Sequence, residues 1–250
     1  MLKTWSFSRI QVFEQCPYRA KLAYIDRLPE PPRPAGKEHP LDRGTRVHES
    51  AERFVRGQTD QLTHECADFE PEFVKLRQLF REKMVTLEGD WGFDRDWSPT
   101  GWSAPNVWGR MKLDAFVKLS KTHAVVIDYK TGRMSGNEVK HADQGQQYQL
   151  GAFMRNPDIE LITVEFWYLD QNDMSQMTFT RDQGLRFFKN VNDRALKMTE
   201  ALDFPPKPNA FNCKWCPYGP KGTGACTHGV DIDNGSYNTA NKRRQADGMG

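Results

Sequence analysis

The sequence predicts an α/β fold in which helices flank a central mixed sheet. Residues 123–130 form a short apolar run that ends in turn residues, which is typical of a buried strand. A second strand-like run, 106–119, precedes it after a short polar link, which is typical of an antiparallel hairpin. A helical segment then leads to the β-rich run 161–169. The order helix, strand, strand, helix, strand indicates an α/β core.

Further elements follow from periodicity and from capping and stop signals. Ser8 and Gln11 form a capping-box pattern that opens an amphipathic helix, and Pro17 interrupts this helix after Cys16. We predict four further helices, over 42–57, about 71–87, 141–154 and about 182–201. The stretch 89–105 is predicted to be a loop or an irregular strand, and 176–180 a short strand. The polar stretch 229–250 predicts a disordered tail.

Composition indicates a soluble globular protein. Of the 250 residues, 27% are charged and 38% hydrophobic, which is enough to form a sizeable core in one or two domains. We find no apolar stretch as long as a membrane span and no secretory signal at the N-terminus, so we expect no membrane partner and a cytoplasmic location. The net charge of +2 neither requires nor excludes nucleic acid.

The end of the strand over 123–130 carries the first candidate site. Asp128 and Lys130 lie on the same face of that strand, because successive side chains alternate. Taken alone, two solvated charges at a strand end would explain them. Asp114, however, lies near the middle of the preceding strand and can face Asp128 across the hairpin. Two carboxylates so close repel unless a cation separates them, and Mg²⁺ prefers oxygen ligands. Lys130 could then orient water or neutralise phosphate charge.

Five short motifs occur in an order that resembles the RecB-like branch of the PD-(D/E)XK nucleases, over residues 5–228. The motifs are Ser8…Cys16-Pro17, Arg43-Gly44-Thr45-x-x-His48, Gly109-Arg110…Asp114, Asp128-Tyr129-Lys130-Thr131-Gly132 and Gln149-Leu150-Gly151-Ala152-Phe153. A lone helical histidine such as His48 is more often a packing or surface residue, and this order is more specific than any single motif.

The resemblance implies a restriction-endonuclease-like core and a role for each site residue. The metal ligands would be His48, Asp114, Asp128 and the backbone carbonyl of Tyr129, and Lys130 would be the catalytic lysine. Gln149 would support the site from the following helix. Phe153 stands where the family has a tyrosine, and whether Tyr148 replaces that tyrosine stays open.

Four of the five cysteines suggest a second metal centre. Cys213 and Cys216 are two residues apart, Cys226 follows, and Cys16 lies near the other end of the chain, whereas Cys66 has no partner pattern. Spacing alone favours zinc bound by the three C-terminal cysteines and His228. Resemblance to the iron–sulfur subset of the family, which includes the AddB subunit and the CRISPR-associated exonucleases, instead implies a [4Fe–4S] cluster on Cys16, Cys213, Cys216 and Cys226.

The resemblance also implies one nuclease domain over 1–228, with a core over 42–200. Segments 5–28 and 205–228 would form a cysteine-cluster cap that joins the two ends of the chain. Unliganded cysteines remain an alternative to any metal at this cap.

By family likeness, we expect an Mg²⁺- or Mn²⁺-dependent exonuclease that cleaves DNA with a free end. The expected substrate is single-stranded DNA. Such an enzyme serves recombination, repair or replication, with a protein partner from one of these processes, and the absence of a helicase motif suits a phage or mobile-element context. A non-catalytic DNA-binding scaffold and a structure- or site-specific endonuclease are the alternatives. Basic and aromatic residues occur together around Tyr18, in 91–108 and at Lys214-Trp215, where base stacking and core packing explain them equally well.

Overall fold

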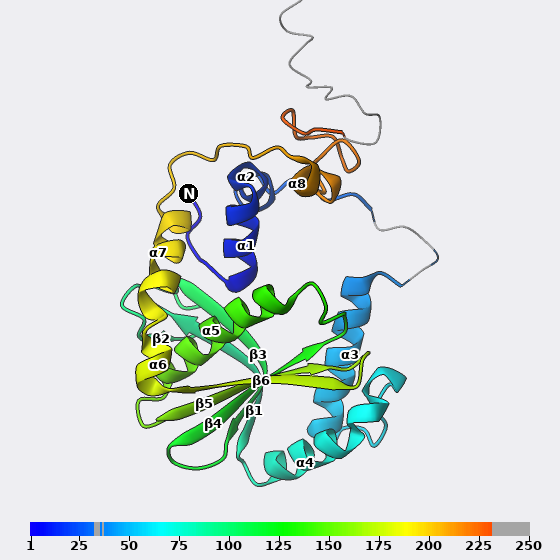
Figure 1. Cartoon of the computed structure of the whole chain (residues 1–250), viewed down its shortest axis with the longest axis vertical. Coiled ribbons are helices and arrows are strands. Elements are labelled where there is room, and N and C mark those ends of the chain that lie inside the picture. The colour runs from blue at the N-terminus through cyan, green and yellow to red at the C-terminus, as the bar shows by residue number, and fades with distance from the viewer. Residues whose placement is uncertain (33–35, 37, 232–250) are drawn as a thin grey trace, which may run out of the picture. The chain divides into compact units, whose positions relative to one another are not determined.

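The computed structural model describes residues 1–32, 36 and 38–231 (Figure 1). Most of the predicted disordered tail therefore lies outside the described residues. The chain divides into two compact units, which we call the terminal unit (Met1–Ala35 with Asp193–Gly250) and the central unit (Gly36–Asn192).

The central unit contains the predicted mixed sheet. Its strand order is β2-β1-β3-β4-β5-β6. The strands are β1 (Val85–Phe93), β2 (Pro99–Thr100), β3 (Gly109–Lys118), β4 (His123–Lys130), β5 (Leu161–Tyr168) and β6 (Asp173–Thr180). Only the pair β4–β5 is parallel, and the long helix α5 (Glu138–Arg155) connects its two strands. The predicted hairpin is confirmed as the antiparallel pair β3–β4.

Helices of the central unit bury one face of the sheet in a large apolar core. These helices are α3 (Pro40–Val55), the 3₁₀ helix η1 (His64–Phe69) and α4 (Glu70–Arg81). The apolar stripe of α3, formed by Val47, Ala51, Phe54 and Val55, packs in this core together with Ile127 and Tyr129 of β4. The 3.6-residue period places His48 beside the stripe and not within it. Two further helices, α6 (Arg181–Leu185) and α7 (Phe188–Thr199), replace the single predicted helix over 182–201.

The start of the sheet differs from the sequence-based prediction. The predicted helix over 71–87 ends at Arg81, and strand β1 already begins at Val85. Lys83 in the connecting turn has φ +62°, which is a left-handed conformation that a lysine in the sequence does not predict. The predicted irregular stretch 89–105 includes the second half of β1. Gly92 is required there, because a Cβ would lie 2.5 Å from the Gly101 carbonyl oxygen.

The terminal unit brings the two ends of the chain together. Helices α1 (Phe7–Gln15) and α2 (Pro17–Tyr24) meet at Cys16, where Pro17 interrupts the helix as predicted. Arg194 Nε donates a 2.7 Å hydrogen bond to Glu14, and Tyr218 OH donates one of 3.2 Å to the Leu28 carbonyl. A short helix, α8 (Ala210–Lys214), carries Cys213. Among the described residues, none of the helices combines the length and apolar character that crossing a bilayer requires.

Candidate active site

The carboxylate of Asp114 is held between helix α3 and strand β4. The β3–β4 register pairs Ala115 with Ile127, so one further step places Asp114 opposite Asp128. Asp114 Oδ1 lies 2.9 Å from His48 Nδ1, and Asp114 Oδ2 accepts a 2.6 Å hydrogen bond from the Tyr129 backbone N–H. The structure therefore brings three of the predicted site residues, His48, Asp114 and Asp128, to one place.

Helix α5 contacts the other side of the β4 strand end. Tyr148 OH donates a 2.8 Å hydrogen bond to Asp128 Oδ1. Lys130 Nζ lies 2.5 Å from Asp128 Oδ2 and donates a 2.8 Å hydrogen bond to Gln144 Oε1. Gln144 in turn donates a 2.7 Å hydrogen bond to Tyr148 OH. Asp128 and Lys130 thus share a face, as alternation predicted, and a closed ring of polar contacts fixes both.

Gln149, which was predicted to support the site, does not join this ring. Its side-chain amide donates to the carbonyls of Gln146 and Gly184, at 2.9 and 3.1 Å, and Phe153 is buried on the same side of α5. Five residues along a helix correspond to a rotation of about 140°, so Gln144 and Gln149 cannot both face β4. Gln144 and Tyr148 have the same four-residue spacing that the family motif has, and this spacing in the sequence could have identified them.

Gln144 and Gln149 should therefore respond differently to substitution. We expect Gln144→Leu to lower the rate of DNA hydrolysis about 10- to 100-fold, because Lys130 loses the acceptor that orients it. Gln146→Leu, on the same helix, is the matched control and should keep the wild-type rate. Gln149→Leu should instead lower the melting temperature, since it leaves the buried Gly184 carbonyl without this donor. Equal rates for Gln144→Leu and Gln146→Leu would contradict the assignment.

Glu88 is a site residue that the sequence analysis missed. The ligand atoms of His48, Glu88 and Asp114 all lie within 4.8 Å of one another. Glu88 lies between Leu87 and Gly89, whose partners on β3 flank Asp114, and its φ of +48° is left-handed. This conformation is costly for a residue with a Cβ. Its carboxylate is 2.6 Å from Lys112 Nζ. Glu88 was missed because it lies in the first half of β1, which was not predicted as a strand.

The electrostatics of the site favour a bound cation. Burial raises the pKa of Asp114, and it also raises the pKa of Glu88. Burial opposes protonation of His48, but the hydrogen bond and charge of Asp114 outweigh it and raise the pKa of that imidazole. Asp128 Oδ2 is buried and accepts no well-aligned hydrogen bond, although Lys130 is near. Carboxylate oxygens with one imidazole form a donor set that suits Mg²⁺ or Mn²⁺, so the residues present fit a divalent metal.

Arg43 and Gly44, which precede His48 in its motif, contact residues that follow β4 and β5. Its guanidinium forms a fork with the Asp170 carboxylate, at 2.5 and 2.8 Å, and donates a 3.2 Å hydrogen bond to the Thr131 carbonyl. Gly44 faces Thr131, and a Cβ at this position would be in van der Waals contact with the Thr131 hydroxyl oxygen, at 3.4 Å. These contacts hold helix α3 against the turn that follows β4, and so fix His48 relative to Asp128.

The site opens into a cavity of about 540 Å³ in the central unit. Its lining combines the acidic residues with the end of β4 and the first turns of α3. The lining residues are Pro40, Leu41, Gly44, Thr45, His48, Glu49, Glu52, Glu88, Lys112, Asp114, Asp128, Thr131 and Tyr148. The carboxylates are therefore accessible to a ligand and are not sealed in the core.

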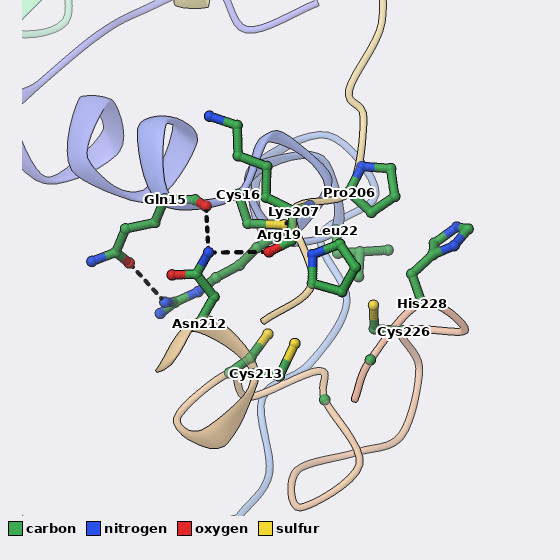
Figure 2. A pocket seen from close by; sticks show the side chains of 14 residues that line it. Gln15, Cys16, Arg19, Leu22, Pro206, Lys207, Asn212, Cys213, Cys226 and His228 are labelled. Atoms are coloured by element: carbon green, nitrogen blue, oxygen red, sulfur yellow. Dashed lines mark hydrogen bonds between the residues drawn. The ribbon is translucent and has the colours of Figure 1, made fainter. Parts of the chain in front are cut away.

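The terminal unit holds the four predicted cluster cysteines around one pocket (Figure 2). Cys16, Cys213, Cys216 and Cys226 all line it, together with His228. The Lys207 backbone N–H donates a 3.4 Å hydrogen bond to Cys16 Sγ. Cys66 belongs to the hydrophobic core of the central unit, so it does not contribute to this pocket.

The fold and the acidic site define a nuclease of the restriction-endonuclease-like class. The chain belongs to the PD-(D/E)XK nuclease superfamily, whose family model matches residues 4–220. The predicted fold class and nuclease class are thereby confirmed, and DNA is the substrate class that the family implies.

Two solved structures resemble the chain at low sequence identity. SSO0001 is 13% identical, with a TM-score of 0.47 over 87% of this chain and 84% of its own. An exonuclease candidate from Eubacterium rectale is 11% identical, with a TM-score of 0.48 over 86% of each chain. A comparison with curated protein sequences gives no match.

Proposed function

We propose that the protein is an Mg²⁺- or Mn²⁺-dependent exonuclease that hydrolyses DNA from a free, single-stranded end. One observation carries the catalytic part of this proposal. His48, Glu88, Asp114 and Asp128 line one cavity, and Lys130 is held 2.5 Å from Asp128. The preference for free ends is supported by the order of sequence motifs, which resembles that of RecB-like exonucleases.

The residues of the site have distinct roles in this proposal. A divalent ion held by Asp114, Asp128 and His48, with Glu88 and the Tyr129 carbonyl as further ligands, would polarise the phosphate and lower the pKa of a bound water. The Tyr129 N–H fixes one oxygen of Asp114 and leaves the other directed toward His48. Tyr148 orients Asp128, and Gln144 holds the Lys130 ammonium where it can stabilise charge on a phosphate.

A cleavage assay on two forms of DNA tests the proposal. Linear and covalently closed circular DNA are incubated with the anaerobically purified protein and Mg²⁺ or Mn²⁺, with EDTA as the control. We expect release of nucleotides from linear single strands and no cleavage of circles. Cleavage of circles would identify an endonuclease. DNA binding without cleavage of any substrate would identify the non-catalytic alternative.

Glu88 should contribute to metal affinity as well as to activity. We expect Glu88→Gln to weaken Mn²⁺ binding about 10-fold or more in calorimetry, because one anionic ligand becomes neutral. Lys112→Met should not weaken Mn²⁺ binding, since it removes the cation that pairs with Glu88 in the absence of metal. Glu49→Gln is the matched control, because Glu49 lines the same cavity outside the His48–Glu88–Asp114 group. Equal Mn²⁺ affinity for the Glu88 and Glu49 variants would exclude Glu88 as a ligand.

We also propose that the four cysteines around the pocket of Figure 2 hold a [4Fe–4S] cluster. A tetrahedral zinc site with Zn–S distances near 2.3 Å requires sulfurs about 3.8 Å apart. Among the described residues, no three of the four cysteine sulfurs lie within 4.8 Å of one another, and His48, Glu88 and Asp114 form the one group of potential metal ligands that does. The cysteines are thus spread more widely than zinc needs, which favours the larger cluster. The cluster would join the two ends of the chain.

The same sequence resemblance supports a role in DNA recombination, repair or replication, and a phage or mobile-element setting. We also expect the protein to bind a partner protein from one of these processes. Co-purification of the tagged protein from its native cell, with and without nuclease treatment of the lysate, separates a protein partner from a shared DNA tether.

A further inference from the structure

Burial distinguishes among the aromatic residues that accompany basic residues in the sequence. Trp91, Trp97 and Trp108 are at most 5% exposed and belong to the core of the central unit. The Tyr18 ring packs edge-on against His228, with the ring centroids 5.0 Å apart. Trp215, by contrast, is 74% exposed. Core packing therefore explains Trp91, Trp97 and Trp108 and does not explain Trp215.

Phe211 extends the exposed aromatic surface at Trp215. Phe211 lies on α8 and is 75% exposed, and Trp215 follows it by four residues at the C-cap of this helix. Trp215 follows the last residue of α8, Lys214, so about one turn of chain separates the two exposed residues. Two exposed rings this close in the chain offer flat apolar faces to which unpaired bases can bind.

The helix that carries these rings is held firmly. Asn209 caps its N-terminus by accepting a 2.8 Å hydrogen bond from the Asn212 N–H. The Asn212 side chain donates hydrogen bonds to the carbonyls of Gln15 and Lys207, at 2.9 and 3.1 Å (Figure 2). Cys213 is buried. The inward side of α8 is thus anchored, and the exposure of Phe211 and Trp215 is a consequence of the fold of the terminal unit.

The charge around the two rings indicates what they bind. Residues 204–230 contain Lys207, Lys214 and Lys221 and no Asp or Glu. Lys214 and Lys221 are exposed, and Lys214 Nζ lies 5.3 Å from the centroid of the Trp215 ring. Lys207 Nζ instead donates a 2.9 Å hydrogen bond to the Glu14 carbonyl. A groove of about 310 Å³ adjoins Phe211 and is lined by Lys214, Lys221 and one acid, Asp231. Cationic groups beside exposed aromatic rings suit a polyanion that carries planar bases.

We infer that Phe211 and Trp215, with Lys214 and Lys221, form a surface that binds single-stranded DNA by base stacking. We call it the stacking surface. Paired bases present their faces to one another within the duplex, so only unpaired bases can stack on these rings. The inference rests on the proposed function, since it names the surface with which a DNA-cleaving enzyme would hold a single strand.

Binding in EDTA tests the stacking surface without cleavage. Fluorescence anisotropy of labelled oligothymidine is measured with the full chain, purified anaerobically, and each variant is checked for an unchanged circular dichroism spectrum. We expect Phe211→Ala and Trp215→Ala each to raise the Kd about 10-fold. Trp215→Phe should retain most of the affinity and Trp215→Leu should not, because leucine keeps apolar area but has no π face. Leu202→Ala is the matched control, at an 87% exposed apolar position in the same unit.

Intrinsic fluorescence gives a second measurement. Oligothymidine should quench part of the wild-type tryptophan emission, and Trp215→Phe should abolish this quenching. The inference is overturned if Trp215→Ala binds oligothymidine as tightly as wild type, if duplex binding weakens equally, or if oligouridine binds more tightly than oligothymidine. Failure of the proposed function is distinguishable, because it would appear as absent cleavage by the wild-type protein with Mg²⁺ or Mn²⁺, whatever the result in EDTA.

Discussion

Lys130→Met and Asp128→Asn are each expected to reduce DNA hydrolysis by about 10³-fold while the protein remains folded. Asp128 is a candidate metal ligand, and a metal acting as Lewis acid stabilises transition-state charge by several kcal/mol, of which about 4 kcal/mol corresponds to 10³-fold. Lys130 places a positive charge 2.5 Å from Asp128 Oδ2. Removing one preorganised group that stabilises developing charge commonly costs 10²–10³-fold in rate.

Two measurements separate the roles of these residues. Asp128→Asn should also weaken Mn²⁺ binding in calorimetry, whereas Lys130→Met should leave Mn²⁺ affinity close to that of wild type. Lys118→Met, at an exposed position on the neighbouring strand β3, is the control for loss of a lysine. Wild-type rates for both Asp128→Asn and Lys130→Met would show that catalysis takes place elsewhere.

Cys213→Ser is expected to have the largest effect on stability. Structural metal centres contribute about 10 kcal/mol or more to the folding of small domains. The described residues of the terminal unit form three short helices besides the end of α7, and its two chain segments meet around the four cysteines. A loss of only about 4 kcal/mol would lower the melting temperature of a chain this long by about 8–16 °C. Limited proteolysis should therefore cut the terminal unit of the variant faster than that of wild type.

Absorbance and metal content show which centre the cysteines hold. Wild-type protein purified without oxygen should be brown and contain about four iron atoms per chain, as a [4Fe–4S] cluster requires. Cys213→Ser should lose this colour. Cys66→Ala is the control, because Cys66 is a buried cysteine of the central unit and lies far from the pocket in sequence. A colourless wild-type protein with one zinc would establish the zinc alternative, and unchanged stability without any metal would establish free thiols.

Much of the fold could be predicted because its signals are local. The apolar run that ends in Asp128 and Lys130 predicted β4, and the short polar link before it predicted the hairpin with β3. Pro17 predicted the break between α1 and α2, because proline lacks the N–H that continues a helix. Strand β1 was predicted only in part. Its first residues were assigned to the helix over 71–87 and its second half to a loop or irregular strand, because the left-handed residues Lys83 and Glu88 are not glycines.

The sequence by itself determined that Asp128 and Lys130 share a face at the end of β4, because side chains alternate along a strand. It also identified Asp114 and His48 as candidates. Only the tertiary structure decided which side chains surround them. The rotation of α5 selects Gln144 and Tyr148 over Gln149 and Phe153, because that rotation depends on how the whole helix packs on the sheet. Likewise, only packing shows that Trp215 is exposed while Trp97 is buried, because a tryptophan near a basic residue, such as Arg95 or Lys214, can occupy either position.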